Sequence, residues 1–239
     1  MRALLFLLLM MIVLSPITAR SDCVQGDCTN GYGAWVTSSG HEYKGQWEGG
    51  KPNGKGVATL PNGNVFEGNF RDGRMEGHGT ETYQSGRKYV GEFKDSKYHG
   101  NGTDTYPDGR IYSGEFRKGK PHGIGMLTFP DGRTYTGEFK NGEPNGRGTV
   151  VRANGAIYVG EFKNGIPCGQ GTMSFPDGRK YDGEFKEGKH HGYGTMTWPD
   201  GSSYVGEWKK DLMDGHGTAI HPDGGKDIGQ FKEGKYIRN

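Results

Sequence analysis

An aromatic residue returns every 23 positions in this chain, and no insertion interrupts the period. The aromatics that begin the eight repeats are Tyr43, Phe66, Tyr89, Tyr112, Tyr135, Tyr158, Tyr181 and Tyr204. Counted from that aromatic, glycine occupies positions 3, 12, 14 and 21 in all eight repeats and position 8 in six of them. A fixed period of this length predicts a chain built from stacked copies of one small supersecondary unit.

Each repeat carries the signals of two strands and two turns. Positions 1, 3 and 5 alternate aromatic, glycine, aromatic, and a period of two is typical of a strand with one buried face. Glycine at position 8, as in Lys140-Asn141-Gly142, supplies the positive φ of a tight hairpin turn. We expect the second strand to begin near the glycines at 12 and 14 and to end in a Pro-Asp-Gly turn, as at 130–132. The repeat therefore predicts an all-β chain, an elongated single-layer antiparallel meander of about eight 23-residue β-hairpins.

Composition fits this fold and excludes one class of partner. Glycine accounts for 46 of the 239 residues, and only Gly26, Gly49 and Gly225 fall outside the five glycine columns and their continuations in the terminal half repeats. After residue 19 the chain has 29 Lys and Arg against 28 Asp and Glu. Binding of nucleic acid by charge needs a clear positive excess, so we expect no nucleic-acid partner.

Residues 1–19 have the pattern of a secretory signal peptide. Arg2 precedes an apolar run that ends at Leu14, and Ala19 offers a cleavage site. The run is short for a membrane span, although an uncleaved anchor is the alternative. We expect cleavage near Ala19 and export to a periplasm, an organelle lumen or the medium.

The cysteines agree with export. Cys23 and Cys28 lie close together, and in an oxidising compartment they could close a small loop as a disulfide; the alternative is two free thiols. Cys168 is left over in a turn where other repeats carry His or Asn, and we interpret it as a bystander rather than a nucleophile.

The repeat pattern resembles a known family. In the fifth repeat its residues are Tyr135-Thr136-Gly137-Glu138-Phe139, Gly142, Gly146 and Gly148. They resemble the MORN (membrane occupation and recognition nexus) repeat, and the resemblance covers roughly residues 30–239. It implies an accessory module that occurs in proteins of very different activity. In enzymes with such repeats the catalytic domain is additional sequence, and the family has been linked to phospholipids and membrane attachment.

We divide the chain into four parts. Residues 1–19 are the signal peptide, and 20–42 are an N-terminal half-repeat cap that contains two cysteines. Residues 43–226 are the eight repeats, and 227–239 form a C-terminal half-repeat cap. Asp227 replaces the first aromatic in that last cap, which suits a solvated sheet edge.

The two aromatic columns are the first candidate for a binding surface. They can be a core of stacked rings, or a groove that accepts a helix or an extended segment of a partner. A single-layer sheet leaves one face uncovered, so we expect partial exposure. The candidate face consists of Tyr112, Phe116, Tyr135, Phe139, Tyr158, Phe162, Tyr181 and Phe185.

Other candidates are weaker. Glu at position 4 and Lys or Arg at position 6 predict a solvated face of compensating charges, whereas an anionic-lipid site would need unpaired Lys and Arg. His190 and His191 belong to the best histidine cluster, but equivalent residues of neighbouring repeats lie about 9.6 Å apart, too far to share a metal ion easily. We therefore expect no metal, no cofactor and no catalytic residue.

Two main hypotheses of different class remain. The first is an exported, non-enzymatic scaffold that binds a protein partner, or a second copy of itself, along the aromatic face. The second is a phospholipid or membrane-surface binding module. A third and weaker hypothesis is an enzyme that uses the region around His190 and His191.

Overall fold

The computed structural model describes residues 21–238, which form strands and turns and contain no helix. The predicted signal peptide therefore lies outside the described residues. The strands are β1 (Ser21–Gly26), β2 (Tyr32–Thr37), β3 (Glu42–Glu48), β4 (Lys51–Thr59), β5 (Val65–Arg71), β6 (Arg74–Thr82), β7 (Lys88–Lys94), β8 (Lys97–Thr105), β9 (Ile111–Arg117), β10 (Lys120–Thr128), β11 (Thr134–Lys140), β12 (Glu143–Val151), β13 (Ile157–Lys163), β14 (Ile166–Ser174), β15 (Lys180–Lys186), β16 (Lys189–Thr197), β17 (Ser203–Lys209), β18 (Leu212–Ile220), β19 (Lys226–Lys232) and β20 (Lys235–Tyr236).

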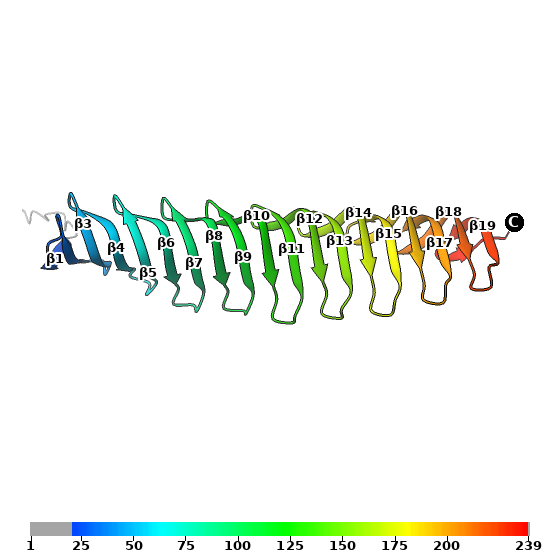
Figure 1. The fold of residues 1–239 in the computed structure, drawn as a ribbon, viewed down its shortest axis with the longest axis horizontal. Coiled ribbons are helices and arrows are strands. Elements are labelled where there is room, and N and C mark those ends of the chain that lie inside the picture. The colour runs from blue at the N-terminus through cyan, green and yellow to red at the C-terminus, as the bar shows by residue number, and fades with distance from the viewer. Residues whose placement is uncertain (1–20, 239) are drawn as a thin grey trace, which may run out of the picture.

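The sheet is a single open meander. Every strand pairs antiparallel with the strands before and after it in sequence, from β1 to β20. Figure 1 shows the result as an elongated ribbon with the N-terminal strands at one end and the C-terminal strands at the other. The predicted all-β, single-layer meander is confirmed, and the part of the chain that the structure describes contains no helix that could cross a membrane.

Two kinds of turn join the strands. In the fifth repeat the hairpin turn has positive φ at both Asn141 (56°) and Gly142 (98°), as a two-residue hairpin requires. The wider turn closes when the Phe129 N–H donates to the Arg133 carbonyl at 2.9 Å and the Gly132 N–H donates back to the Phe129 carbonyl at 3.0 Å. Glycine at position 21 is needed there because φ is +85° at Gly132.

A line of paired glycines crosses the sheet. Gly137 pairs with Gly125 on one side and with Gly148 on the other, and the other repeats have the same pairing. The Tyr135 ring lies over this line, so a Cβ atom added at Gly148 would be 2.5 Å from the Tyr135 hydroxyl. These glycines therefore provide the space in which the aromatic rings lie.

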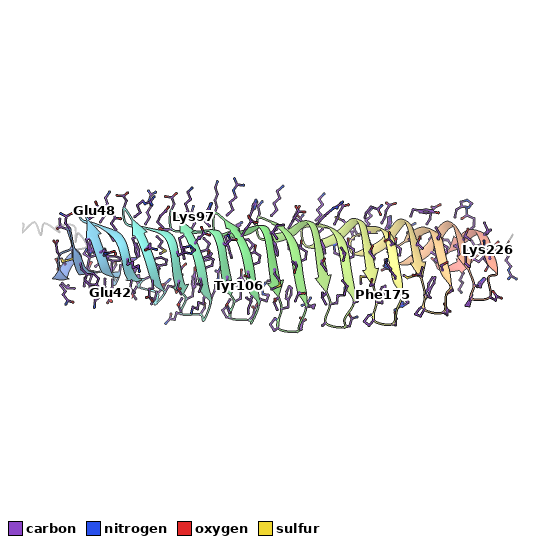
Figure 2. The ribbon with its side chains drawn as sticks, viewed as in Figure 1. Glu42, Glu48, Lys97, Tyr106, Phe175 and Lys226 are labelled. Carbon is purple, nitrogen blue, oxygen red and sulfur yellow. A yellow bond between two sulfur atoms is a disulfide. The ribbon has the colours of Figure 1, made fainter. Side chains whose placement is uncertain are left out.

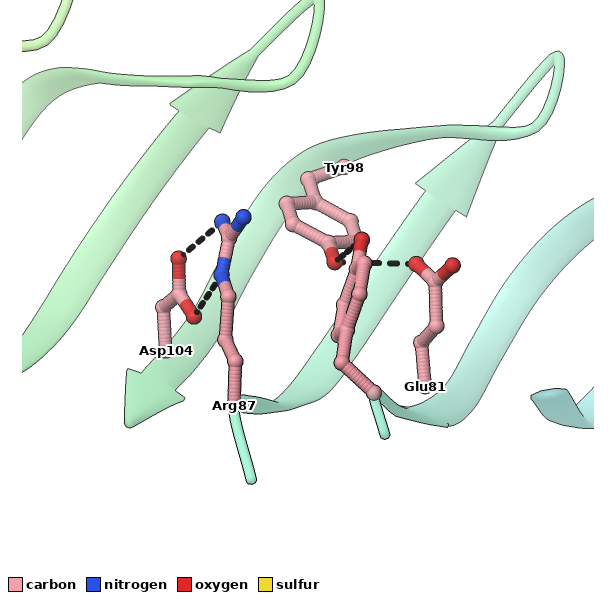
Figure 3. Close-up of polar contacts among 5 residues, drawn as sticks. Glu81, Arg87, Tyr98 and Asp104 are labelled. Carbon is pink, nitrogen blue, oxygen red and sulfur yellow. Dashed lines mark hydrogen bonds and ion pairs between the residues drawn. The ribbon is translucent and has the colours of Figure 1, made fainter. Parts of the chain in front are cut away.

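The strands bend where they cross the glycine line. The register of β11 and β12 shifts between Gly137 and Phe139, and a bulge of this kind bends a strand. The second strand begins at position 9, not near position 12 as the sequence suggested, because Phe139 still pairs with Pro144 beyond the bulge. Figure 3 shows such a bent strand. We call its concave side, which carries positions 1, 5, 10, 16, 18 and 22 of the repeats, the trough.

The two ends of the sheet differ. At the N-terminus Cys23 and Cys28 form a disulfide between β1 and the turn before β2, as predicted. The Trp47 indole donates to the Gly33 carbonyl at 3.1 Å and so ties β2 to the first full repeat. At the other end of the described residues, the two-residue β20 pairs with β19 and forms a short edge.

Candidate binding surface: the trough

The aromatic columns form the core instead of an open face. The eight rings named as a candidate face are only 0–6% exposed. The Tyr135 ring meets Phe139 of its own repeat edge-on at 5.0 Å and Phe162 of the next at 4.9 Å between centroids, and this T-shaped contact continues along the sheet. The Tyr135 hydroxyl donates to the Glu138 carbonyl at 2.8 Å. The rings are buried, so the expectation of partial exposure is wrong.

Residues at position 10 explain this burial. Because the sheet is bent, they face back onto the tyrosine at position 1. Tyr98 stacks on Tyr89 at 3.6 Å, and His190 stacks on Tyr181 at 3.9 Å. The other repeats place smaller or unbranched residues there: Pro52, Met75, Pro121, Pro144, Pro167 and Met213. Sequence reasoning missed this covering layer, although the recurrent proline at position 10 was a signal for it.

The rim of the trough is built by the wide turn. Arg133 lies over the Phe129 ring, with 4.5 Å between its Cζ and the ring centroid, and its Nε donates to Asp131 at 2.7 Å. The pairs Tyr106–Arg110 and Phe175–Arg179 repeat this arrangement. The sequence Pro-Asp-Gly-Arg therefore encodes both a turn and a charge-compensated lid over the aromatic residue at position 18.

A network of polar side chains lies in the trough between β6 and β8, and Figure 3 shows its labelled members Glu81, Arg87, Tyr98 and Asp104. The Tyr98 hydroxyl donates to Glu81 Oε2 at 2.9 Å and lies 2.6 Å from the Tyr83 hydroxyl, which therefore donates to it. Burial, together with the Tyr83 hydrogen bond and the Glu81 charge, raises the pKa of Tyr98 far above its usual value. Both hydroxyls stay protonated in the neutral range.

Arg87 completes this network. Its Nε donates to Asp104 Oδ1 at 2.8 Å and its Nη2 donates to Oδ2 at 2.5 Å, while Asp104 is fully buried. The guanidinium also lies 5.1–5.6 Å from the ring centroids of Tyr83, Tyr98 and Tyr106. The hydrogen bond with Asp104 raises the pKa of Arg87 above its usual range. Arg87 therefore occupies the space among these three rings.

The C-terminal half of the trough is open. A hollow of about 230 Å³ lies between half-buried Leu127, Phe129 and Val150. A second hollow of about 420 Å³ lies over Phe175 and Trp198. The lining of the smaller hollow is mostly apolar, whereas the larger one mixes apolar side chains with Arg179, His190 and Asp211. Both include residues that pack against the core on one side and face solvent on the other, such as Phe175, which is labelled in Figure 2.

His190 lies in the wall of the second hollow. Burial lowers the pKa of His190, Arg152 and Arg179 lower it further, and the Asp211 carboxylate opposes the shift. Asp211 also accepts the backbone N–H of His190 at 2.8 Å. The imidazole is therefore neutral at neutral pH and stacks as part of the floor. Within residues 21–238 no group of three or more His, Cys, Asp or Glu side chains is placed to hold a metal ion.

The outer face carries the charged columns. Glu138 accepts the Arg147 N–H at 2.8 Å and covers Gly146, whose φ is +106°. In residues 21–238 no ion pair joins a glutamate at position 4 to a position-6 cation; Glu115 and Glu138 instead accept backbone N–H groups beside the bulge. This face also exposes Val159 (51%) and Tyr193 (58%), and a shallow furrow of about 650 Å³ follows the glycine line near its N-terminal end.

Solved structures with related architecture are distant. The TCP10 domain of Danio rerio CPAP is 17% identical, with 81% of this chain and 91% of that chain covered and a TM-score of 0.46. The TCP domain of Drosophila melanogaster SAS-4, solved with a proline-rich motif of Ana2, is 14% identical, with coverages of 64% and 84% and a TM-score of 0.42. Likeness at this level carries no functional assignment, and a comparison with curated proteins found no match.

The family comparison agrees with the geometry. The family model described as MORN repeat matches eight consecutive segments. They are residues 43–65, 66–86, 89–109, 112–132, 135–157, 158–178, 181–203 and 204–226. These segments begin at the eight aromatics that define the period and cover most of the sheet. The chain therefore belongs to the MORN repeat family.

Proposed function

We propose that this protein is a non-enzymatic scaffold that binds a protein partner, or a second copy of itself, along the trough. The observation that carries the proposal is the pair of apolar hollows over Val150 and over Phe175 and Trp198. Side chains that rest on a rigid core and face solvent lose little conformational entropy when a partner covers them. A partner segment would therefore gain apolar burial at a preformed surface.

The polar network supports a role in binding rather than in catalysis. Tyr98 donates to Glu81 and Arg87 donates to Asp104, and the raised pKa values of Tyr98 and Arg87 keep both groups protonated at neutral pH. General acid–base chemistry needs a group that titrates near the working pH and can reach a substrate. This cluster provides rigidity, which suits a scaffold.

We place the scaffold in an exported compartment. The disulfide between Cys23 and Cys28 supports this location, because such bonds persist in oxidising environments. Mass measurement of the mature N-terminus tests it: we expect a chain that begins at Arg20, and an intact Met1 in the functional protein would contradict it.

Matched substitutions on the two faces test partner binding. Immobilised protein is used to capture partners from an extract of the source cells, with quantitative mass spectrometry as the readout. Phe175→Ser with Trp198→Ser removes the apolar floor of the larger hollow, whereas Val159→Ser with Tyr193→Ser removes exposed apolar groups from the outer face. We expect the first pair to abolish capture and the second to leave it unchanged. Capture that depends only on the outer pair would overturn the proposal.

The lipid alternative needs its own test. Near-neutral charge argues against a strong pull to anionic membranes, since binding of that kind needs uncompensated Lys and Arg. Sedimentation with anionic vesicles at low salt should leave the protein in the supernatant. Sedimentation with the vesicles that is lost at high salt would favour the lipid function.

A further inference from the structure

The fifth repeat breaks the pattern of the wide turn. Repeats 3, 4 and 6 have an aromatic residue at position 18, Asp at position 20 and Arg at position 22. The fifth has Arg152-Ala153-Asn154-Gly155-Ala156 instead. The backbone still closes in the same way, with the Arg152 N–H donating to the Ala156 carbonyl at 2.8 Å. The fold therefore tolerates the change, and only the side chains on the rim differ.

Arg152 differs from the regular rim arginines in having no aspartate partner. In the regular turns Arg133 and Arg179 each lie over a ring and bond an aspartate at 2.7 and 2.8 Å. Within residues 21–238 the guanidinium of Arg152 has no ion pair, hydrogen bond or ring contact. The guanidinium of Arg152 is therefore available to bond a ligand in the trough.

The position of this charge is specific. Arg152 lines both the 230 Å³ hollow over Val150 and the 420 Å³ hollow over Phe175, so it stands between two apolar depressions. The neighbouring His190 is held neutral by burial, and the nearby Asp211 bonds the His190 backbone. The open half of the trough thus places the unpaired Arg152 between two hollows, with the Asp211 carboxylate in the lining of the larger one.

The closed half instead presents a carboxylate. Glu81 accepts the Tyr98 hydroxyl and has no ion pair within residues 21–238, whereas Asp104 pairs with Arg87. A segment lying along the trough would therefore meet the Glu81 carboxylate in the closed half and the unpaired Arg152 guanidinium in the open half. Charge complementarity of this kind sets the orientation and register of a bound segment.

We propose that the trough around Arg152 binds an extended segment of the partner in which an acidic residue lies between large apolar residues. This inference rests on the proposed function and names the chemistry of the partner. The carboxylate bonds the guanidinium, whose planar donors fit two carboxylate oxygens, and the apolar side chains enter the two hollows.

Three synthetic peptides provide the test. Each has nine residues. Leucine stands two residues and four residues away from the central residue in both directions, and serine fills the remaining positions. The central residue is Glu, Gln or Lys. Binding is measured by fluorescence anisotropy, with labelled peptides and the purified protein at low salt. We expect the Glu peptide to bind about tenfold more tightly than the Gln peptide, and the Lys peptide to bind more weakly than the Gln peptide.

Variants assign the preference to one side chain. Arg152→Gln should bring the Glu peptide to the affinity of the Gln peptide without changing the latter, and Arg152→Lys should keep part of the preference. Arg133→Gln is the matched control, because Asp131 already neutralises Arg133, and it should leave the preference intact.

Three outcomes would overturn the inference: equal binding of the Glu and Gln peptides, a preference that survives Arg152→Gln, or no binding of any peptide. If the Glu and Gln peptides bind equally and both lose binding in the Phe175→Ser, Trp198→Ser variant, the scaffold function is supported and the preference for an acidic residue is refuted. Failure of the scaffold itself appears separately, in the capture experiment that leaves Arg152 unchanged.

Discussion

The two halves of the trough share one core and differ in what covers it. Tyr98 and His190 occupy the same repeat position and stack on equivalent tyrosines at 3.6 and 3.9 Å. Around Tyr98 the rim positions hold mutually bonded polar groups, and the surface is closed. Around His190 they hold methionine and tryptophan, and the surface is hollow. The periodic residues therefore fix the sheet, and the non-periodic ones decide where it can bind.

The sharpest difference between the halves is the buried ion pair. Asp104→Ala removes the carboxylate that holds Arg87 and leaves the guanidinium among tyrosines. Loss of one partner of a buried pair is costly, and Arg87 keeps some access to water, so we expect destabilisation by about 3 kcal/mol in urea unfolding. Asp108→Ala breaks the exposed pair with Arg110 and should have a much smaller effect, because solvent screens that pair. Equal effects of the two substitutions would contradict the account.

The shared core should respond equally in both halves. A Cβ atom added at Gly102 would lie 2.4 Å from the Tyr89 hydroxyl, and one at Gly194 would lie 2.3 Å from the Tyr181 hydroxyl. Overpacking of this kind typically costs about 1–3 kcal/mol. We expect Gly102→Ala and Gly194→Ala to lower the urea midpoint by similar amounts. A large effect in one half alone would show that the cores differ.

Alkaline pH should weaken the fold, and Tyr106 of the closed half contributes to this loss. Burial and the nearby Asp104 raise the pKa of Tyr106 to about 12, whereas an unfolded tyrosine titrates near 10. A raised tyrosine pKa means that the folded state favours the neutral phenol. This stabilisation is therefore complete below pH about 10 and is lost as the pH rises toward 12.

The Tyr106→Phe variant isolates this contribution, because phenylalanine keeps the ring and removes the ionisation. Stability followed by circular dichroism from pH 9 to 12 should fall less steeply in the variant than in the wild type. Identical slopes would mean that Tyr106 titrates normally.

The sequence predicts the repeated part of this fold well. The roles of residues such as Tyr135, Gly137 and Gly142 can be predicted from their own repeat. Aromatic residues that alternate with glycine predict a strand, and a glycine that precedes the next strand predicts a turn. Period-two reasoning, however, describes a flat sheet. The bulge opposite Glu138 depends on pairing between strands, so neither the bend nor the resulting burial of the aromatic columns is visible in one repeat.

The candidate site was harder to predict for the same reason. Tyr98 and Arg152 depart from the columns, and a search for periodic residues passes over them. Their importance appears only when the bend brings position 10 over position 1 and places the wide turns along the rim. A column-by-column search for exceptions would have found both residues.

Site-specific photo-cross-linking tests the central claim that partners occupy the open half of the trough. Benzoylphenylalanine replaces Phe175 in the larger hollow, Tyr83 in the closed half, or Tyr193 on the outer face, and each protein is irradiated with the captured partner. The account predicts a cross-linked product from position 175 and none from positions 83 and 193. Cross-linking from position 193 without a product from position 175 would contradict it.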